Sequence, residues 1–252
     1  MSFIAYLFAA YLFGSIPWGY LIAKLHGINI VKKGSGNIGA TNIYRTLGFS
    51  YALVVFLLDV LKGLLVMLVA KFSVNSHYEI AMLALAVILG HTFSIFLRGK
   101  GGKGIATTFG VLLILIGWKV MGVVLLAAIC LMLITRYMSL TNLILIWIFP
   151  SFFVFVNPDF AYFALGVGVV LLIYWEHRDN IERLKEGREL ELAVKIGIKS
   201  VKKTTPSIAN VAAPMRANKK SVASKKKVIQ KKQTSKAKSE VVAKKRPLKK
   251  RS

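Results

Sequence analysis

The stretch YALVVFLLDVLKGLLVMLVA, from Tyr51 to Ala70, contains only two charged side chains, Asp59 and Lys62. As a helix it would be about 30 Å long, which matches the hydrocarbon thickness of a bilayer. Its apolar residues form a continuous run rather than recurring with the period of an amphipathic helix or strand, so the stretch predicts a membrane-spanning helix. Asp59 and Lys62 would share one helix face near the membrane middle, where ionisable groups usually meet a partner or a cavity. We expect them to neutralise each other, either as a structural ion pair or as part of a substrate site.

Most of the remaining chain repeats this pattern. Hydrophobic residues make up 56% of the 252 residues, and they gather in seven long apolar runs. The runs lie at residues 2–23, 51–70, 80–97, 105–118, 120–134, 140–156 and 160–174. Because backbone polar groups must be hydrogen-bonded internally inside hydrocarbon, such runs predict an all-α integral membrane protein, a polytopic helical bundle with about seven membrane helices. The fourth, fifth and seventh runs are shorter than the roughly 20 residues of an untilted span, so five spans with interfacial or re-entrant pieces are the alternative.

Positive charge is concentrated near the carboxyl terminus. Of the 35 lysine and arginine residues, 20 lie between residues 191 and 252, where Glu191 and Glu240 are the only acidic ones. This composition predicts two parts, a membrane-embedded domain at residues 1–190 and a disordered Lys-rich tail at 191–252. A basic tail is attracted to anionic lipid. Nucleic acid is not an expected partner, because the tail offers no aromatic side chains for base stacking.

The loops between the runs give an expected orientation. Basic residues are frequent after the first, third, fifth and seventh runs, whereas the opposite loops offer only Lys71 and Lys119. By the positive-inside rule, the basic loops and the tail are cytoplasmic and the amino terminus is outside. The first run has no basic segment before it, so we expect a retained span rather than a secretory signal.

A glycine-rich, basic stretch follows the first run. It reads KKGSGNIGATNIYR, from Lys32 to Arg45. Glycines leave backbone amides uncovered, and amides with nearby cations are the groups that grip an anionic phosphate. The residues expected to bind a small phosphate ester here are Ser35, Gly36, Asn37, Gly39, Thr41, Asn42 and Arg45. The planar guanidinium of Arg45 suits bidentate phosphate contacts. A flexible interfacial turn that binds nothing is the alternative.

A second stretch of the same kind, RGKGGKGIATT from Arg98 to Thr108, follows the third run. The expected phosphate contacts come from Lys100, Gly101, Gly102, Lys103 and Gly104. Both stretches match the spacing GxGxxG, but their membrane-run neighbours exclude a dinucleotide-binding βαβ unit. The second stretch is not a Walker A loop either, because Lys103 is followed by Gly104 rather than by Ser or Thr. The sequence therefore predicts two phosphate cradles at one membrane face.

A third polar stretch, WEHRDNIERLKEGRE from Trp175 to Glu189, follows the last run. It places His177, Asn180 and Glu182 close together, and His177 could act as a general base because its ordinary pKa lies near neutrality. The alternative is an ordinary amphipathic helix at the membrane surface. The other histidines are scattered and Cys130 is the only cysteine, so we expect no metal and no cofactor.

In order along the chain, three segments resemble the three motifs of a known enzyme family. The segments are GSGNIGATNIYRTLG at Gly34 to Gly48, LGHTFSIFLRGKGGKGIATTFG at Leu89 to Gly110, and EHRDNIERLKEGRE at Glu176 to Glu189. They are similar to those of the bacterial membrane acyltransferase that acylates glycerol 3-phosphate from acyl phosphate. The resemblance extends over residues 1–190, including LLDVLKG at Leu57 to Gly63, and leaves the basic tail uncovered.

This resemblance implies the transfer of a fatty acyl group from acyl phosphate to the 1-hydroxyl of glycerol 3-phosphate. The products would be lysophosphatidic acid and phosphate, made at the cytoplasmic face of the bacterial inner membrane as the first step of phospholipid synthesis. By motif, Ser35 and Arg45 would be essential in the first stretch and His177 and Asn180 in the third. Gly101, Gly102 and Lys103 would form the acyl-phosphate loop, and Glu182 or Glu189 could be structural.

Two other functions stay open at this point. One acyltransferase class uses a His followed five positions on by an Asp and takes thioester donors; here His177 is followed at that distance by Glu182, a near miss. The other alternative is a transporter for an organic phosphate, with Asp59 and Lys62 on its path. Transporters often contain repeated halves with matching broken helices, and we find no convincing internal repeat.

Overall fold

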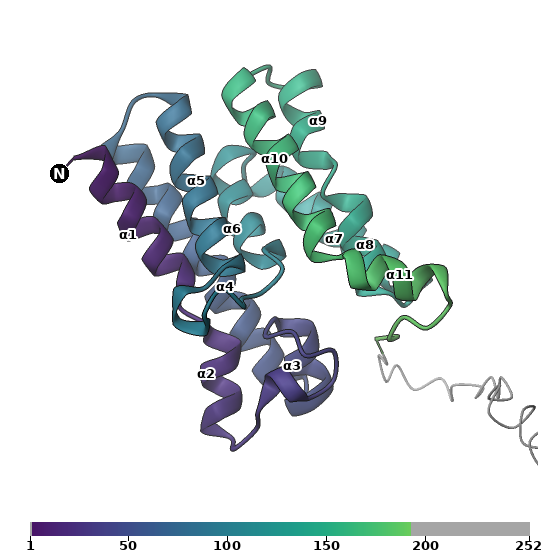
Figure 1. Cartoon of the computed structure of the whole chain (residues 1–252). Coiled ribbons are helices and arrows are strands. Elements are labelled where there is room, and N and C mark those ends of the chain that lie inside the picture. Colours follow the sequence, from purple (N-terminus) through teal and green to yellow (C-terminus); the bar gives the residue numbers. More distant parts are fainter. Residues whose placement is uncertain (1, 193–252) are drawn as a thin grey trace, which may run out of the picture. The chain divides into compact units, whose positions relative to one another are not determined.

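The structure, a computed structural model, describes residues 2–192, which belong to one compact unit (Figure 1). All regular secondary structure in this range is helical, as expected. The α-helices are α1 (Phe3–Ser15), α2 (Trp18–Leu25), α3 (Ala40–Leu47), α4 (Phe49–Ser73), α5 (His77–Thr92), α6 (Ile105–Leu115), α7 (Trp118–Thr135), α8 (Met138–Leu145), α9 (Ile148–Phe155), α10 (Phe160–Glu176) and α11 (Arg178–Lys185), with short 3-10 turns at Ile30–Lys32 and Ile95–Leu97.

Each of the seven predicted apolar runs contains helix, but fewer than seven are long enough to cross a bilayer. Five helical segments in the described residues pass that test. They are Phe3–Leu25, Phe49–Ser73, His77–Leu97, Trp118–Thr135 and Met138–Phe155. A sixth is counted if α10 and α11, which are bent by 59° at their junction, are taken together. The count of about seven is therefore reduced to five or six, because α6, the fourth run, is only 11 residues long.

Glycines allow two pairs of helices to pack backbone against backbone. A Cβ atom on Gly63 of α4 would lie 2.1 Å from the Thr107 carbonyl oxygen of α6, and one on Gly110 of α6 would lie 2.0 Å from the Val60 carbonyl oxygen. Gly14 of α1 and Gly90 of α5 meet the opposite helix in the same way. Small residues at helix contacts are typical of membrane bundles, where close van der Waals packing drives association. Through the α4–α6 contact, the start of α6 is fixed against the middle of α4.

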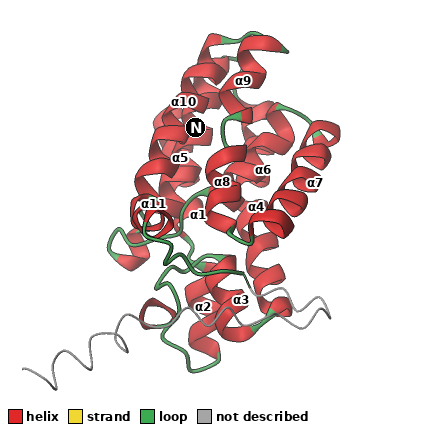
Figure 2. Ribbon diagram, turned by 90° about the vertical axis from the view of Figure 1, so that its right-hand side faces the viewer, coloured by secondary structure: helices red, strands yellow, loops and turns green. Residues whose placement is uncertain are grey.

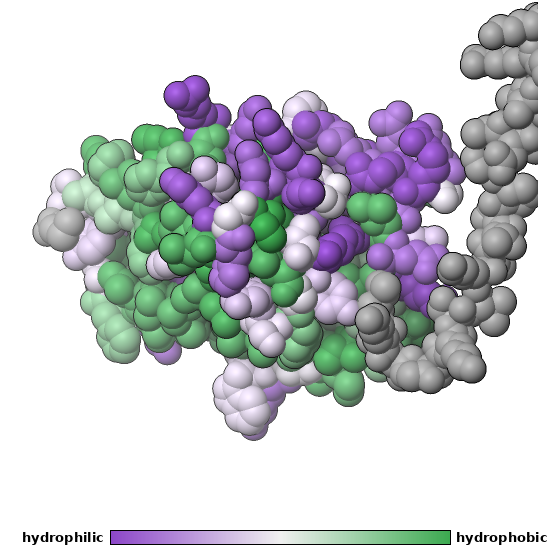
Figure 3. Space-filling view, turned by 90° about the horizontal axis from the view of Figure 1, so that it is seen from below, coloured by the Kyte–Doolittle hydropathy of each residue, from purple (hydrophilic) through white to green (hydrophobic). Residues whose placement is uncertain are grey.

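The three polar stretches lie toward one end of the bundle. Figure 1 shows α2, α3 and α11 in the lower half of the molecule, Figure 2 shows α2 and α3 at the bottom with α11 above them, and Figure 3 views the molecule from below. Hydrophilic side chains gather over this face, whereas hydrophobic side chains cover the flank on the left of the view. This arrangement is compatible with the expected cytoplasmic face, although the orientation in the membrane stays a prediction. The predicted disordered tail lies outside the described residues from residue 193 onward.

Candidate active site

The first glycine stretch is a loop folded around the side chain of Asn42. The Asn42 Oδ1 accepts a hydrogen bond from the Ser35 amide at 3.0 Å, and its Nδ2 donates to the carbonyls of Lys33 at 3.0 Å and Asn37 at 2.7 Å. Asn42 is only 1% exposed. A satisfied amide of this kind organises a loop rather than contacting a ligand. Substrate binding by Asn42 itself stays a prediction, and its contacts favour an internal role.

Polar groups of two further residues of this stretch also form hydrogen bonds within the loop. The Asn37 Oδ1 accepts from the Gly39 amide at 2.7 Å, and the Gly36 amide donates to the Lys33 carbonyl at 3.0 Å. The Ser35 hydroxyl and the Thr41 hydroxyl have no hydrogen-bond partner among the described residues. Both hydroxyls are therefore free to contact a substrate.

Arg45 lies on α3, a helix that the sequence analysis did not predict. Its Nη2 donates to the main-chain carbonyl of Leu190 at 2.8 Å, 145 residues away in sequence. Its Nε is buried and has no acceptor in the described residues. A buried N–H group without an acceptor is costly, and a phosphate oxygen would satisfy it with a charge-assisted bond. Phosphate binding by Arg45 stays a prediction, and the buried Nε favours it.

The second glycine stretch is tied to the end of α5. The Gly101 amide donates to the Thr92 carbonyl at 2.9 Å, and the Gly102 amide donates to the His91 carbonyl at 3.0 Å. The amides of Gly99 and Lys100 are also bonded within the chain. The cradle expected from the sequence therefore cannot use the amides of Gly101 and Gly102. The free amides are those of Lys103, Gly104 and the first turn of α6, where a helix N-terminus also favours an anion.

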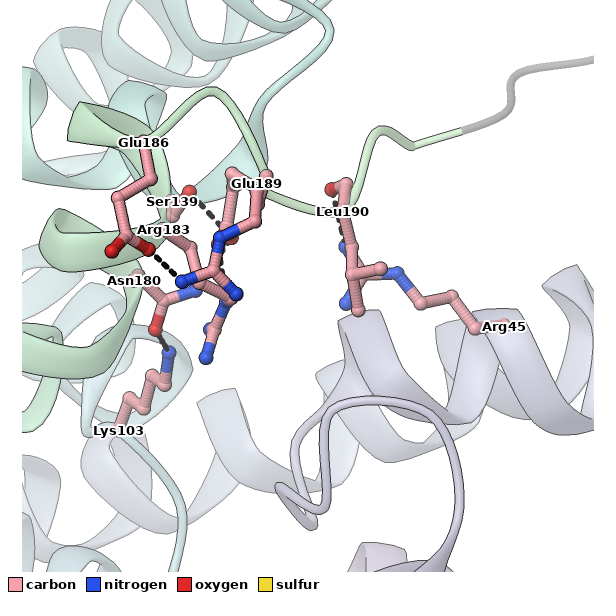
Figure 4. A network of polar contacts seen from close by, with 9 residues as sticks. Arg45, Lys103, Ser139, Asn180, Arg183, Glu186, Glu189 and Leu190 are labelled. Carbon is pink, nitrogen blue, oxygen red and sulfur yellow. Dashed lines mark hydrogen bonds and ion pairs between the residues drawn. The ribbon is translucent and has the colours of Figure 1, made fainter. Parts of the chain in front are cut away.

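The Lys103 ammonium joins this loop to the third polar stretch. It donates to Asn180 Oδ1 (Figure 4), and Asn180 Nδ2 donates in turn to Glu189 Oε1 at 2.6 Å. Asn180 and Glu189 are 6% and 8% exposed. Two motif residues predicted to act together, Lys103 and Asn180, are thus in contact although they are 77 residues apart.

Glu189 belongs to a segment after α11, residues 186–192, which we call the strap. Its carboxylate also accepts from Ser139 Oγ at 2.9 Å and from Arg183 Nε at 2.8 Å. The strap continues to Leu190, whose carbonyl accepts a hydrogen bond from Arg45 (Figure 4). The Leu192 amide donates to the Arg136 carbonyl at 2.9 Å. The sequence analysis missed Ser139, Arg183 and Leu190. Arg183 lies within the third polar stretch but was not singled out there, whereas Ser139 and Leu190 lie outside all three stretches and had no local signal.

The network has a characteristic charge pattern. Burial lowers the pKa of Lys103 to about 8, although the negative charge of Glu189 opposes this change. Burial alone would raise the pKa of Glu189, but hydrogen bonds from Asn180, Arg183 and Ser139 outweigh it and lower that pKa. Lys103 and Arg45 both lie in the field of Glu189. The site therefore gathers Arg45, Lys103 and Arg183 around the Glu189 carboxylate, while Glu176 and Asp179 also act on Lys103.

His177 lies at the polar break between α10 and α11 and is 1% exposed. Its Nδ1 is 2.8 Å from the Ile173 carbonyl, so Nδ1 carries the proton and Nε2 is the acceptor. Burial, together with the positive charge of Lys103, lowers the pKa of His177 to about 4. The imidazole is therefore neutral near pH 7 and a weaker base than an ordinary histidine.

The other predicted residues lie around this centre. Lys100 is exposed and makes no side-chain contact with the described network, and Glu182 is also exposed. Among the described residues, no group of three His, Cys, Asp or Glu side chains is placed to hold a metal ion.

Comparison with known proteins gives the family of the chain. The glycerol-3-phosphate acyltransferase family matches residues 4–187. The glycerol-3-phosphate acyltransferase of Carboxydothermus hydrogenoformans is 41% identical over 187 residues, covering 74% of this chain and 94% of the relative. A Thermus thermophilus enzyme of the same name is 40% identical over 207 residues, covering 75% of this chain and 95% of that relative.

Solved structures agree with these relatives. Crystal structures of PlsY, an integral membrane glycerol 3-phosphate acyltransferase, in its glycerol 3-phosphate and lysophosphatidic acid forms have TM-scores of 0.72 and 0.70 with this chain. Both are 36% identical to it, and each match covers 76% of this chain and 96% of the solved one. The chain therefore belongs to the PlsY family of integral membrane glycerol-3-phosphate acyltransferases.

Proposed function

We propose that this glycerol-3-phosphate acyltransferase takes its acyl group from acyl phosphate and transfers it to the 1-hydroxyl of glycerol 3-phosphate. The observation that carries the proposal is the meeting of Arg45, Lys103 and Asn180 around the strap, because it joins three separate polar stretches into one cationic site. Two substrates that each carry a phosphate group need such a site. Membership in an enzyme family removes the phosphate-transporter alternative.

In the proposed arrangement, each glycine stretch holds one phosphate group. Ser35 and Arg45 bind glycerol 3-phosphate, while Lys103 and the start of α6 bind the acyl phosphate. Holding both substrates in register makes the reaction effectively intramolecular, which can contribute about 7–11 kcal/mol when the geometry is good. The Lys103 ammonium also stabilises negative charge that develops on the carbonyl oxygen and on the departing phosphate.

The chemistry needs no nucleophile from the enzyme. Acyl phosphate is a mixed anhydride, so the 1-hydroxyl oxygen attacks the carbonyl carbon directly, the bond from that carbon to the phosphate oxygen breaks, and inorganic phosphate leaves. The hydroxyl proton passes to a phosphate oxygen of a substrate. His177 suits this transfer less well, because its pKa is about 4 and its Nδ1 proton is bound to Ile173. We assign His177 the role of fixing the junction of α10 and α11 beside Lys103.

The site is proposed to face the cytoplasm of the bacterial inner membrane. The support is the positive-inside pattern of the loops together with the location of α2, α3 and α11 at one polar end (Figure 1). The acyl chain would then extend between the helices while its phosphate stays at the polar end. The Lys-rich residues beyond 192 are proposed to contact anionic lipid, at about 1 kcal/mol for each basic residue near the surface.

A direct assay tests the donor. The purified full chain in lipid is given labelled glycerol 3-phosphate and one of three donors: acyl phosphate, acyl-CoA or acyl carrier protein. We expect labelled lysophosphatidic acid with acyl phosphate only, and equal amounts of inorganic phosphate. Product from a thioester donor and none from acyl phosphate would refute the proposed donor, whereas membranes lacking the chain supply the background rate.

The pH dependence should follow Lys103. Because the pKa of Lys103 is about 8, the ammonium is present below that pH and is lost as the pH rises through it. We therefore expect kcat/KM to fall about tenfold per pH unit above roughly pH 8. His177, with a pKa of about 4, should produce no change between about pH 5.5 and about pH 7.5.

The Lys103→Arg variant is the control for this profile. Its guanidinium stays charged, so the decrease in kcat/KM above about pH 8 should move out of the measurable range. The value of kcat/KM itself should drop to about one tenth, because the two cations differ in shape. Substrate ionisation is the same for both proteins, so the difference between their profiles isolates residue 103. Identical alkaline limbs would show that Lys103 is not the titrating group.

A further inference from the structure

Three ionisable side chains are buried inside the bundle, outside the site described above. Asp59 and Lys62 come from α4, and His91 comes from the last turn of α5. Their exposed fractions are 3%, 1% and 5%. The proposed reaction uses none of them, although ionisable groups at membrane depth are costly and are seldom retained without a function.

The three side chains form one cluster around the Lys62 ammonium. Lys62 Nζ is 2.9 Å from Asp59 Oδ1 and 3.4 Å from His91 Nδ1. His91 Nδ1 also lies 3.5 Å from Asp59 Oδ1, so this one ring nitrogen faces both members of the ion pair. Asp59 and Lys62 together hold the orientation of the His91 ring.

The free edge of the His91 ring lies directly against the second glycine loop. A Cβ atom on Gly102 would be 2.2 Å from His91 Nε2, and the Gly102 amide donates to the His91 carbonyl. Gly102 immediately precedes Lys103, whose ammonium reaches Asn180. The position of the ring therefore limits the position of the backbone immediately before Lys103.

The same cluster also lies beside the other end of the loop. Gly63, the neighbour of Lys62, packs against the Thr107 carbonyl in the first turn of α6. Lys103 thus lies between two such contacts, that of His91 with Gly102 before it and that of Gly63 with Thr107 after it.

We infer that Asp59, Lys62 and His91 are positioning residues that hold the loop from Gly101 to Gly104 in register, and so set the place of the Lys103 ammonium. This inference rests on the proposed function of the loop in binding a substrate phosphate. A simple ion pair would not need a histidine as third member, and buried ion pairs can often be replaced by apolar residues without loss of stability. The location of His91 at the loop gives the cluster a role that an apolar pair could not supply.

Steady-state kinetics of the full chain in lipid, with both substrates varied, separate the two roles. One variant, Asp59→Leu with Lys62→Met, removes both charges together and so avoids leaving one buried charge unpaired. We expect it to fold, and we expect KM for acyl phosphate to rise about tenfold with KM for glycerol 3-phosphate changed less than about twofold. A cluster with only a structural role would lower the amount of active protein and leave both KM values unchanged.

Two substitutions of His91 test its two ends. His91→Asn keeps a polar atom near the Nδ1 position facing Lys62 but withdraws from Gly102, whereas His91→Gln reaches toward Gly102 and lacks an acceptor at the Nδ1 position. Both variants should raise KM for acyl phosphate. The control His77→Asn alters an exposed histidine of α5 that pairs with Asp159, and it should change neither KM for acyl phosphate nor KM for glycerol 3-phosphate. Unchanged KM values in both His91 variants would overturn the inference even if folding were impaired.

A double-mutant cycle supplies a second readout. Gly102→Ala places a Cβ against the ring and should raise KM by itself, and His91→Asn should relieve that clash, so the two effects should be strongly non-additive. Additive effects would contradict direct contact.

If KM for glycerol 3-phosphate rises in place of that for acyl phosphate, the positioning role stands and the loop holds the phosphate group of glycerol 3-phosphate. A failure of the proposed donor is distinguishable, because the wild-type chain itself would then be inactive with acyl phosphate.

Discussion

Arg45→Ala is expected to reduce kcat/KM for glycerol 3-phosphate by about 1,000-fold, because it removes a planar cation from the phosphate site. The guanidinium already has one partner, the Leu190 carbonyl, and its buried Nε lacks one in the described residues. A phosphate oxygen would supply the missing acceptor inside a partly buried site, where a charge-assisted bond is strong. Steady-state rates at varied glycerol 3-phosphate, with saturating acyl phosphate, measure the effect.

Two other substitutions make this result specific. Arg45→Lys keeps the charge but loses the fork of donors, so we expect an intermediate loss of about 30-fold. Arg188→Ala removes an exposed arginine of the strap, which pairs with Glu186, and should leave the rate within about twofold. If Arg45→Ala kept more than about a tenth of the wild-type rate, α3 would not be the site of a substrate phosphate.

The helical segments of the bundle could be predicted because membrane insertion depends on local composition. A continuous run of apolar residues is enough to predict a helix in a membrane, and all seven predicted runs contain helix in the structure. The number of full spans was less predictable. Ile105–Leu115 is apolar but short, and sequence alone does not show whether such a helix packs inside the bundle or crosses the membrane.

The predicted site residues come from three segments that contact one another in the structure, but their roles stay predictions and their contacts could not be predicted. The motifs indicated Lys103 and Asn180, and the structure brings them together. Nothing local indicated that the amides of Gly101 and Gly102 would be taken by carbonyls of α5. A glycine in the sequence indicates that another group approaches the backbone closely, but it does not show which group. Here the approaching group is the end of α5 rather than a ligand.

The strap shows the same limit of local reasoning. Glu189 could be named from its motif, but its partners Ser139 and Arg183 come from α8 and α11 and become visible only in three dimensions. Its carboxylate accepts three hydrogen bonds, and those bonds orient Asn180 toward Lys103. These bonds also lower the pKa of Glu189, which makes it a weak proton acceptor, so we propose that Glu189 positions the groups that act on the substrate.

Lys103→Met is expected to lower kcat/KM for acyl phosphate by about 1,000-fold, which corresponds to about 4 kcal/mol of transition-state stabilisation. Methionine has nearly the length of lysine and no charge, so the loop should keep its packing while the ammonium is lost. In the structure that ammonium is partly buried and is held by Asn180, and Lys103 lies two residues before the start of α6. No other lysine of the second glycine stretch can replace it.

Lys100→Met is the matched control, because it makes the same chemical change three residues earlier in the same loop. Lys100 is exposed and has no side-chain contact in the described residues, so its loss should change kcat/KM by less than about threefold, mainly through weaker attraction of anionic substrates. That small effect should disappear at high salt, whereas the loss in Lys103→Met should persist, since a partly buried charge is screened much less. Equal losses in the two variants, both abolished by salt, would mean that the loop only attracts substrates. A large, salt-resistant loss confined to Lys103→Met would place the Lys103 ammonium at the reacting phosphate.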